Sequence, residues 1–467
     1  MKRRAILYSC FVVTISYGQP VKEKLALAVQ QMEADPQLRH AIIGVCVADN
    51  KTDTVIYEHN AQIGLAPAST QKLFTSCAAF DLLGQHYRYT TEIVYKNFKP
   101  GPSRSYFIIK PSGDPTFGSP RFDSTKATVI LKNIIIALKE KRITPVSSQY
   151  VVFDSAYENN TVPGGWTWED IGNYYGASAQ SLNWLENQYD IVLKSGKKPG
   201  DKVTVVKTRP AGLSDGMRVS VKSAGKGSGD NSIVYLGYGS VPPLMEGTIP
   251  VDEDTFSVGA SLPNPQDVFI QQLNNNMKAE KITMFYGFDS HQPLLTLPDS
   301  LFNFIDVYKH VSPPLDTINY WFLKKSINLY GEALIKTMAF EKSGFGSTGK
   351  GVELVKDFWE EKGIEKSALN ICDGSGLSPQ NRVTTDALVK ALQYAKTRPW
   401  YNSFYHALPE YNSMKMKSGS IGGARAYAGY HTAKDGHTYS FAIIINNYDG
   451  EPAEVVKKMY QLLDNLK

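Results

Sequence analysis

The sequence contains little cysteine and little histidine, and their spacing excludes two common kinds of site. None of the four cysteines forms a Cys-x-x-Cys pair, and no His-Glu-x-x-His occurs among the eight histidines. Zinc and dithiol sites use these spacings, so we expect no metal and no cofactor. Cys46, Cys77 and Cys372 each lie in an apolar stretch and are predicted to be buried free thiols.

Long apolar runs and clusters of basic residues are also missing. Residues 1–18 combine Lys2, Arg3 and Arg4 with an apolar run from Ala5 to Ile15, which is the pattern of a secretory signal. The run is shorter than the about 20 residues that a spanning helix needs, so a retained anchor is the weaker alternative. Cleavage would remove three positive charges from a formal net charge of +5. The signal predicts secretion across the inner membrane, so we expect a periplasmic protein. No basic cluster remains in the rest of the chain, so we expect no nucleic-acid partner.

The pattern of apolar residues divides the mature chain into three parts. Residues 19–94 and 300–467 alternate helical stretches with short strands and end in a hairpin and a helix. Residues 95–299 consist mainly of short β-like runs separated by proline and glycine turns. We therefore expect an α/β domain that is split by mainly β inserted domains.

The stretch "PASTQKLFT", residues 67–75, holds a serine and a lysine one helical turn apart. Ser-x-x-Lys occurs four times in the chain, but the other three copies lie in glycine-rich turns. A helix brings positions i and i+3 to one face, and its first-turn amides point toward a developing anion. Ser69 is therefore the candidate nucleophile, and Lys72 is its candidate base.

A lysine can act as a base only if burial or a second cation lowers its pKa. Lys-Ser-Gly occurs at Lys194, Lys342 and Lys417, and only the last lies in a strand-like alternation, "NSMKMKSGSIGG". Lys417 is therefore the candidate second cation, at the edge of a sheet.

A hydroxyl and an amide would complete the site by passing a proton and orienting the substrate. Ser-x-Asn occurs at Ser181 and Asn183 and again at Ser326 and Asn328. The second pair begins an amphipathic helical stretch, "KKSINLYGE", and is the better candidate. The first pair fits a turn or a cap.

Ser-x-x-Lys, Ser-x-Asn and Lys-Thr-Gly are together the signature of β-lactamases and penicillin-binding proteins. The stretches "PASTQKLFT", "KKSIN" and "KMKSGSIGG" fit this set in the same order, with serine in place of the threonine. With "GDPTF" at 113–117, "GGWTWED" at 164–170 and "DGSGLSPQN" at 373–381, the chain resembles the class C low-molecular-mass penicillin-binding proteins of the penicillin-binding protein 4 type. The resemblance spans nearly the whole mature chain.

The resemblance implies a fold and an activity. The fold would be the penicillin-recognising, β-lactamase-like α/β fold, an antiparallel sheet flanked by helices, with two inserted domains. The activity would be that of a serine D-Ala-D-Ala carboxypeptidase, and also of an endopeptidase, acting on peptidoglycan stem peptides. β-Lactam antibiotics would be its inhibitors.

The resemblance also implies a role for each candidate residue. Ser69 would be the nucleophile and Lys72 its base, with Asn328 orienting Lys72 and the substrate amide. Ser326 would relay the proton to the departing D-alanine, and Lys417 would supply a positive charge for the terminal carboxylate. Substrate contacts are expected at Ser418, Gly419 and Ser420.

Three other functions compete with this interpretation. A Ser-His-Asp hydrolase lacks support because no serine lies in a Gly-x-Ser-x-Gly elbow. A β-lactamase would need a water-activating acid, for which Glu186 in "WLENQ" is the candidate, although it lies in the insert and fits a helix fragment. A non-catalytic peptidoglycan-binding protein of the same fold would not need the complete set of motifs.

Overall fold

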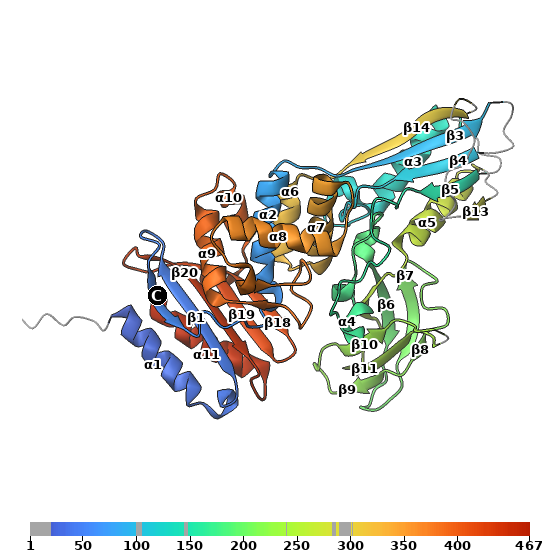
Figure 1. Ribbon diagram of the computed structural model, residues 1–467. Coiled ribbons are helices and arrows are strands. Elements are labelled where there is room, and N and C mark those ends of the chain that lie inside the picture. The colour runs from blue at the N-terminus through green and yellow to red at the C-terminus, as the bar shows by residue number, and fades with distance from the viewer. Residues whose placement is uncertain are drawn as a thin grey trace, which may run out of the picture.

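The computed structural model forms three bodies, one on the left of Figure 1 and two on its right. The predicted signal sequence, residues 1–18, lies outside the described residues. Among the helices that are described, none is long and apolar enough to cross a membrane. The described stretches are 20–99, 105–143, 148–239, 241–282, 286–288, 300 and 302–467.

A six-stranded antiparallel sheet joins the two ends of the chain in the first body (Figure 1). β1 (Ile42–Asp49) pairs with β20 (Thr438–Asn446) along its whole length, with Ile42 opposite Asn446. Both strands are rich in β-branched residues, which favour the pleated conformation. Across the sheet, the strands are β17 (Glu410–Tyr411), β18 (Met414–Ile421), β19 (Ala424–Thr432), β20, β1 and β2 (Val55–His59).

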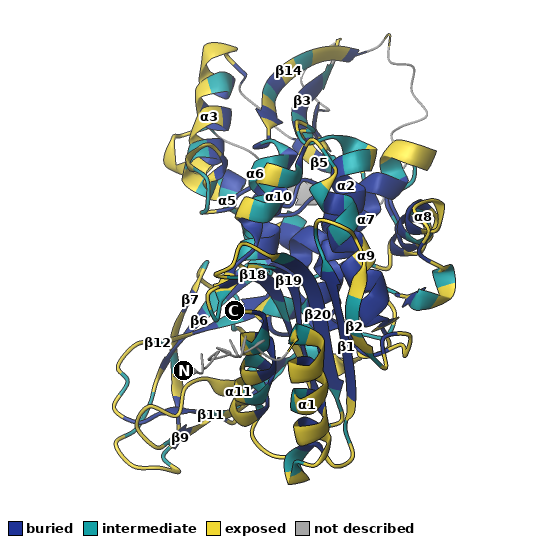
Figure 2. Cartoon of the chain, turned by 90° about the vertical axis from the view of Figure 1, so that its left-hand side faces the viewer, coloured by how far each residue is buried: buried dark blue, intermediate teal, exposed yellow. Residues whose placement is uncertain are grey.

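Helices cover both faces of this sheet. α1 (Val21–Glu33) and α11 (Pro452–Leu463) lie on one face, where Leu25 and Val455 join a buried apolar cluster that includes Met416 of β18. The other face is covered by α2 and by helices from the C-terminal part of the chain. Figure 2 shows the strands as a buried layer between helices whose outer surfaces are exposed. The C-terminal helices of the second layer are α6 (Leu315–Lys324), α7 (Asn328–Ser343), α8 (Thr348–Glu361), α9 (Thr385–Lys396) and α10 (Tyr401–Ala407).

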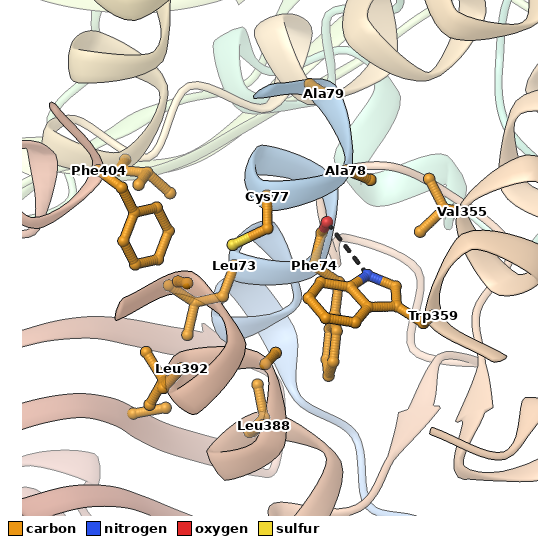
Figure 3. Packing of buried hydrophobic residues seen from close by; sticks show 14 of the residues in the cluster. Leu73, Phe74, Cys77, Ala78, Ala79, Val355, Trp359, Leu388, Leu392 and Phe404 are labelled. Carbon is orange, nitrogen blue, oxygen red and sulfur yellow. Dashed lines mark hydrogen bonds between the residues drawn. The ribbon is translucent and has the colours of Figure 1, made fainter. Parts of the chain in front are cut away.

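Helix α2 (Lys72–Leu83) forms the buried centre of the second layer. Its residues 72–80 are all buried. Figure 3 shows Phe74 against Trp359 of α8, whose indole N–H donates to the Phe74 carbonyl at 3.3 Å. Gly84, at φ 84°, ends the helix, because glycine adopts this conformation without strain. The turn that precedes α2 therefore rests on a closely packed core.

The second body is a five-stranded sheet in the order β13, β5, β4, β3 and β14. β3 (Thr90–Phe98) pairs with β14 (Phe302–Val311), so the chain enters and leaves this body on neighbouring strands. The sequence predicted inserted domains over residues 95–299. In the structure β3 begins earlier, at residue 90, and β14 ends later, at residue 311, so we propose 90–311 as the inserted region. The other elements of this body are β4 (Ser105–Lys110), β5 (Ser148–Val152), β13 (Tyr286–Phe288), α3 (Ala127–Glu140) and α5 (Pro265–Ala279).

The third body contains two small sheets and a short helix. One sheet has the order β12, β6, β7, and the other the order β10, β11, β8, with β9 also paired to β11. Phe107 of the second body shares one apolar cluster with Ile191 and Met245 of the third, so the two inserted bodies have a common core. The elements are α4 (Trp168–Ile171), β6 (Gln188–Lys194), β7 (Thr204–Arg209), β8 (Arg218–Val219), β9 (Lys222–Ala224), β10 (Asn231–Tyr235), β11 (Leu244–Pro250) and β12 (Phe256–Ser261).

The three cysteines in the described part of the chain are free thiols. Cys46 and Cys77 are buried, as predicted, whereas Cys372 is only partly buried. Burial raises the pKa of the Cys46 thiol to about 12, so this thiol is unreactive at neutral pH.

Candidate active site

Ser69 and Lys72 are in hydrogen-bond contact at the start of α2. Ser69 lies in a 3-10 turn, Ala68–Gln71, and the α-helix begins only at Lys72. Three residues per turn align the side chains at i and i+3. Lys72 Nζ accordingly lies 2.9 Å from Ser69 Oγ. The α-helix therefore begins three residues after Ser69, and the tighter turn before it aligns the two side chains.

Three oxygens surround the Lys72 ammonium. Besides Ser69 Oγ, Nζ donates to Asn328 Oδ1 and to the Ser375 carbonyl, each at 2.6 Å. The side chain is fully buried, and this burial lowers the pKa of Lys72 to about 7, although Asp373 and Glu332 partly oppose the shift. A large fraction of Lys72 is therefore uncharged near neutral pH, with a lone pair available for a proton.

Lys417 is the second buried lysine of the site. It projects from β18 toward the face of the sheet that α2 covers, and its Nζ donates to the Ser418 carbonyl at 2.7 Å. Burial, followed by the positive charge of Lys72, lowers the pKa of Lys417 well below its usual range. The two lysines are both buried and interact electrostatically, so their protonation is coupled, and full charge on both is unfavourable at neutral pH.

The Ser-x-Asn pair lies where the loop after α6 leads into α7. Asn328 is the first residue of α7, and besides accepting from Lys72 it donates from Nδ2 to the Tyr175 carbonyl at 2.8 Å. Ser326 has a left-handed backbone, at φ 56°, and lines the same cleft as Ser69. Its hydroxyl has no hydrogen-bond partner in the described part of the chain. It is therefore free to bind a ligand.

The strand β18 approaches the Ser69 turn closely at Gly419. A Cβ atom at Gly419 would lie 2.3 Å from the Pro67 carbonyl oxygen and 3.1 Å from the Ser69 nitrogen. Only glycine lets the strand come this near, which brings Ser420 into the wall of the cleft. Ser418 points away from it, because its hydroxyl donates to the Tyr411 hydroxyl at 3.4 Å. The contact predicted between the Ser418 side chain and a substrate stays a prediction.

A cleft of about 930 Å³ lies between the first body and the inserted region. Ser69, Ser326 and Asn328 line it on one side, and Arg121 and Tyr174 line it from the inserted region. Lys72 and Lys417 are buried and are not among the residues that line it.

The loop 373–378 is a part of the site to which sequence reasoning gave no role. Asp373 is buried and its carboxylate accepts from Gln71 Nε2 at 3.0 Å, Trp166 Nε1 at 2.9 Å and the Ser378 amide at 2.7 Å. These bonds hold the loop whose Ser375 carbonyl binds Lys72. The stretch "DGSGLSPQN" was noted in the sequence, but a backbone carbonyl ligand leaves no signal there.

Glu332 anchors the same loop from α7. Both of its carboxylate oxygens accept from the Gly374 amide, at 3.2 and 3.1 Å. Burial raises the pKa of Glu332 to about 8. The loop that holds Lys72 is therefore fixed on one side by Asp373 and on the other by Glu332.

Glu186 does not take the position of a water-activating acid. Its carboxylate is buried and accepts from Ser119 Oγ at 2.7 Å, Arg121 Nε at 2.9 Å and the Tyr330 hydroxyl at 2.7 Å. It does not line the cleft that contains Ser69. Its turn, Leu185–Asn187, has positive φ throughout and is not a fragment of an ordinary helix.

Two of the motif copies that were not chosen as site candidates have structural roles. Asn183 Oδ1 accepts from the Gln180 amide and closes a turn, as expected for the first Ser-x-Asn. Ser347 caps α8 by accepting from the Lys350 amide, and the lysine side chain is not part of that contact.

Comparison with known proteins identifies the family. The profile of the D-Ala-D-Ala carboxypeptidase 3 (S13) family matches residues 25–411. The chain belongs to this family. The family and the enzyme class that the motifs predict, a serine-type D-Ala-D-Ala carboxypeptidase, are therefore confirmed. The matched residues include Ser69, Lys72, Ser326 and Asn328 and end before Lys417.

Individual relatives agree with the family assignment. A D-alanyl-D-alanine carboxypeptidase from Actinomadura sp. (strain R39) is 25% identical over 457 residues, which cover 89% of this chain and 80% of the relative. The D-alanyl-D-alanine carboxypeptidase DacB from Haemophilus influenzae is 23% identical and covers 87% of this chain and 85% of its own.

The structure of penicillin binding protein 4 from Haemophilus influenzae has the same fold. It matches with a TM-score of 0.75 at 20% identity and covers 95% of this chain and 99% of its own. The predicted penicillin-recognising α/β fold is therefore confirmed.

Proposed function

We propose that the cleft hydrolyses the bond between the two terminal D-alanines of a peptidoglycan stem peptide through an acyl-enzyme on Ser69. The contact of Ser69 Oγ with a buried Lys72, whose pKa is lowered to about 7, carries this proposal. A serine hydroxyl needs a nearby base to become a nucleophile, and a lysine with this pKa is one at neutral pH.

In the first step Ser69 Oγ attacks the carbonyl carbon between the two D-alanines, and its proton passes to Lys72 Nζ. The oxyanion that forms is received by the backbone amides of Ser69 and Ser420, which the absence of a Cβ at Gly419 brings close together. Loss of one such preorganised donor typically costs about a hundredfold or more in rate.

In the second step the carbon–nitrogen bond breaks and the terminal D-alanine leaves as an amine. The Ser326 hydroxyl receives the proton from Lys72 and passes its own to the departing nitrogen, a role supported by its place in the cleft wall. Water then attacks the acyl carbon and gives a proton to Lys72. The bond between Ser69 Oγ and the acyl carbon breaks, Lys72 returns the proton to Ser69 Oγ, and the shortened peptide leaves with its new carboxylate.

The terminal carboxylate of the substrate lies next to Lys417. A carboxylate there favours the charged form of Lys417, and the charge of Lys417 in turn favours the neutral form of Lys72, since the two groups are coupled. Substrate binding thus increases the fraction of Lys72 that is neutral and able to accept a proton. This coupling selects substrates with a free carboxylate at that position.

Three finer proposals accompany this mechanism. β-Lactam antibiotics acylate Ser69 and leave slowly, as stable acyl-enzymes. The same site cleaves D-amino-acid cross-links between stem peptides, which is endopeptidase activity. The N-terminal signal directs the protein across the inner membrane to the periplasm, where its substrate is located.

Incubation of the mature protein with purified muropeptides tests the proposal. We expect release of D-alanine from pentapeptides, splitting of cross-linked dimers, and loss of both activities in Ser69→Ala. Turnover of both substrates by Ser69→Ala at the wild-type rate would contradict it.

A further inference from the structure

Three buried polar residues follow one another at intervals of four along α7. Asn328, Glu332 and Lys336 therefore share one face of the helix. Asn328 binds Lys72, and Glu332 anchors the loop that also binds it. Lys336 has no part in the mechanism described above. Burial of a lysine is costly unless its ammonium group is paired, so the partners of Lys336 indicate what it does.

Lys336 is held by the inserted region. Its Nζ donates to the Ala179 carbonyl at 2.8 Å and to the Thr161 carbonyl at 3.4 Å, and it lies 3.2 Å from Glu158 Oε1. An ammonium group has three N–H donors, and these three oxygens can accept from all of them. Burial lowers the pKa of Lys336, and the charge of Glu158 opposes this shift. The set of acceptors therefore suits the charged form of Lys336.

Glu332 connects this helix face to the loop that binds Lys72. Its carboxylate accepts from the Gly374 amide of that loop. Burial, followed by the charge of Asp373, raises the pKa of Glu332 to about 8, and the charge of Lys336 opposes the rise. The charge of Glu332 in turn opposes the lowering of the Lys72 pKa. The protonation of Lys72 therefore depends on Lys336 through one carboxyl group.

Other titratable groups face this carboxyl group and Lys72 from the neighbouring elements. The charge of Asp373 raises the pKa of both Glu332 and Lys72. Cys372 lies beside Asp373, and its thiol has a pKa that is raised, mainly by burial. Lys417 of β18 interacts with Lys72. Lys336 is the group whose charge links Glu332 to the inserted region.

We propose that Lys336 is a positioning residue for the reaction: it sets how much negative charge Glu332 carries, and Glu332 sets how readily Lys72 gives up a proton. The inference rests on the proposed function, since it takes Lys72 as the base. Loss of the charge on Lys336 favours neutral Glu332, which no longer stabilises the ammonium form of Lys72. The inserted region, which holds Lys336, therefore helps to set the lowest pH at which acylation occurs.

The test compares two titrations of the full mature protein. The first follows the ¹³C shift of Lys72 Cε in protein with labelled lysine, assigned by its loss in Lys72→Arg, and reports the pKa of Lys72 directly. The second follows the second-order rate constant of acylation by penicillin against pH. Glu332→Gln keeps an acceptor for the Gly374 amide and removes the charge. We expect it to move both titrations to lower pH by about one pH unit, the lower end of the effect of one opposite charge at close range.

Glu341→Gln is the matched control. It removes the same charge from an exposed position of the same helix and should move neither titration. Circular dichroism spectra that match the wild type show that each variant is folded.

Lys336→Met should also move both titrations to lower pH, because Glu332 loses a charge that favours its ionised form. A direct effect of Lys336 on Lys72 would have the opposite sign, since removal of one cation raises the pKa of another. In the Glu332→Gln background, Lys336→Met should give no further shift to lower pH, so the double-mutant cycle isolates the effect that passes through Glu332. If Lys336→Met does not fold, Lys336→Gln is used instead, because it keeps two N–H donors for the carbonyls.

The remaining outcomes separate the two proposals. An unchanged Lys72 titration in Glu332→Gln would overturn the inference. A shift to higher pH in the Lys336 variant, or the same shift with and without Glu332→Gln, would also overturn it. A Lys72 signal that moves as expected while the acylation profile stays in place would support the coupling and refute Lys72 as the base. Absence of acylation in the wild type would refute the proposed function, and the Lys72 signal would still test the coupling.

Discussion

Trp166 of the inserted region donates its indole N–H to Asp373 of the first body, with Nε1 and Oδ2 2.9 Å apart. The same carboxylate oxygen accepts from the Ser378 amide at 2.7 Å and so fixes the loop whose Ser375 carbonyl binds Lys72. The inserted region is therefore connected to Lys72, the proposed general base, through one short chain of hydrogen bonds. The inserted region therefore helps to hold the loop that positions Lys72.

Trp166→Phe should lower the rate of acylation by penicillin several-fold. The change keeps the ring but removes one donor to a buried carboxylate, which costs about 1–3 kcal/mol and loosens the loop that holds Lys72. Stopped-flow measurement of the acylation rate constant checks it. Trp168→Phe is the matched control, because that indole is half-exposed and donates to the Leu236 carbonyl. Equal rates in the two variants would show that the Asp373 bond does not support the base.

Gly419→Ala should abolish acylation, whereas Gly422→Ala should have little effect. A Cβ at Gly419 would lie 2.3 Å from the Pro67 carbonyl and push the strand away from Ser69, which separates the two amides that we propose as oxyanion donors. At Gly422 a Cβ meets nothing within 4 Å. Titration of both purified variants with fluorescent penicillin measures the difference. Normal labelling of Gly419→Ala would mean that the close approach is not needed.

The acylation rate should rise with pH through about 7, the pKa of Lys72. The base acts in its neutral form, so loss of a proton from Lys72 activates the enzyme, and the rate falls as pH drops below this value. A profile of the second-order acylation rate constant against pH measures it. A rate that stays constant across this range, or that rises only near the usual pKa of lysine, would contradict the assignment.

Lys72→Arg should keep the positive charge of the site and lose the base, because a guanidinium does not deprotonate in proteins. We expect acylation to fall by at least about a hundredfold, the usual contribution of a general base. Circular dichroism spectra that match the wild type would exclude misfolding as the cause. Near wild-type acylation by this variant would exclude Lys72 as the base.

The sequence predicted the parts of the site that depend on side-chain identity and regular spacing. Ser69, Lys72 and Asn328 meet as expected because a helical turn and a helix start constrain their positions. The family and the fold followed from the order of the motifs.

Contacts of the backbone could not be predicted. The Ser375 and Tyr175 carbonyls bind Lys72 and Asn328, but every residue has a carbonyl, so tertiary packing alone decides which one is used. The side of β18 on which Ser418 lies depends on strand register. The pairing of Glu186 with Arg121 and Tyr330 joins distant segments and could not be read from either stretch.

Mapping of the acylated residue tests the central claim most directly. The protein is incubated with penicillin, digested, and analysed by tandem mass spectrometry, with Ser69→Ala treated in parallel. We predict one acyl group per chain, attached to Ser69, and no stable adduct in Ser69→Ala. A stoichiometric adduct on any other residue, or one that persists in Ser69→Ala, would contradict the account.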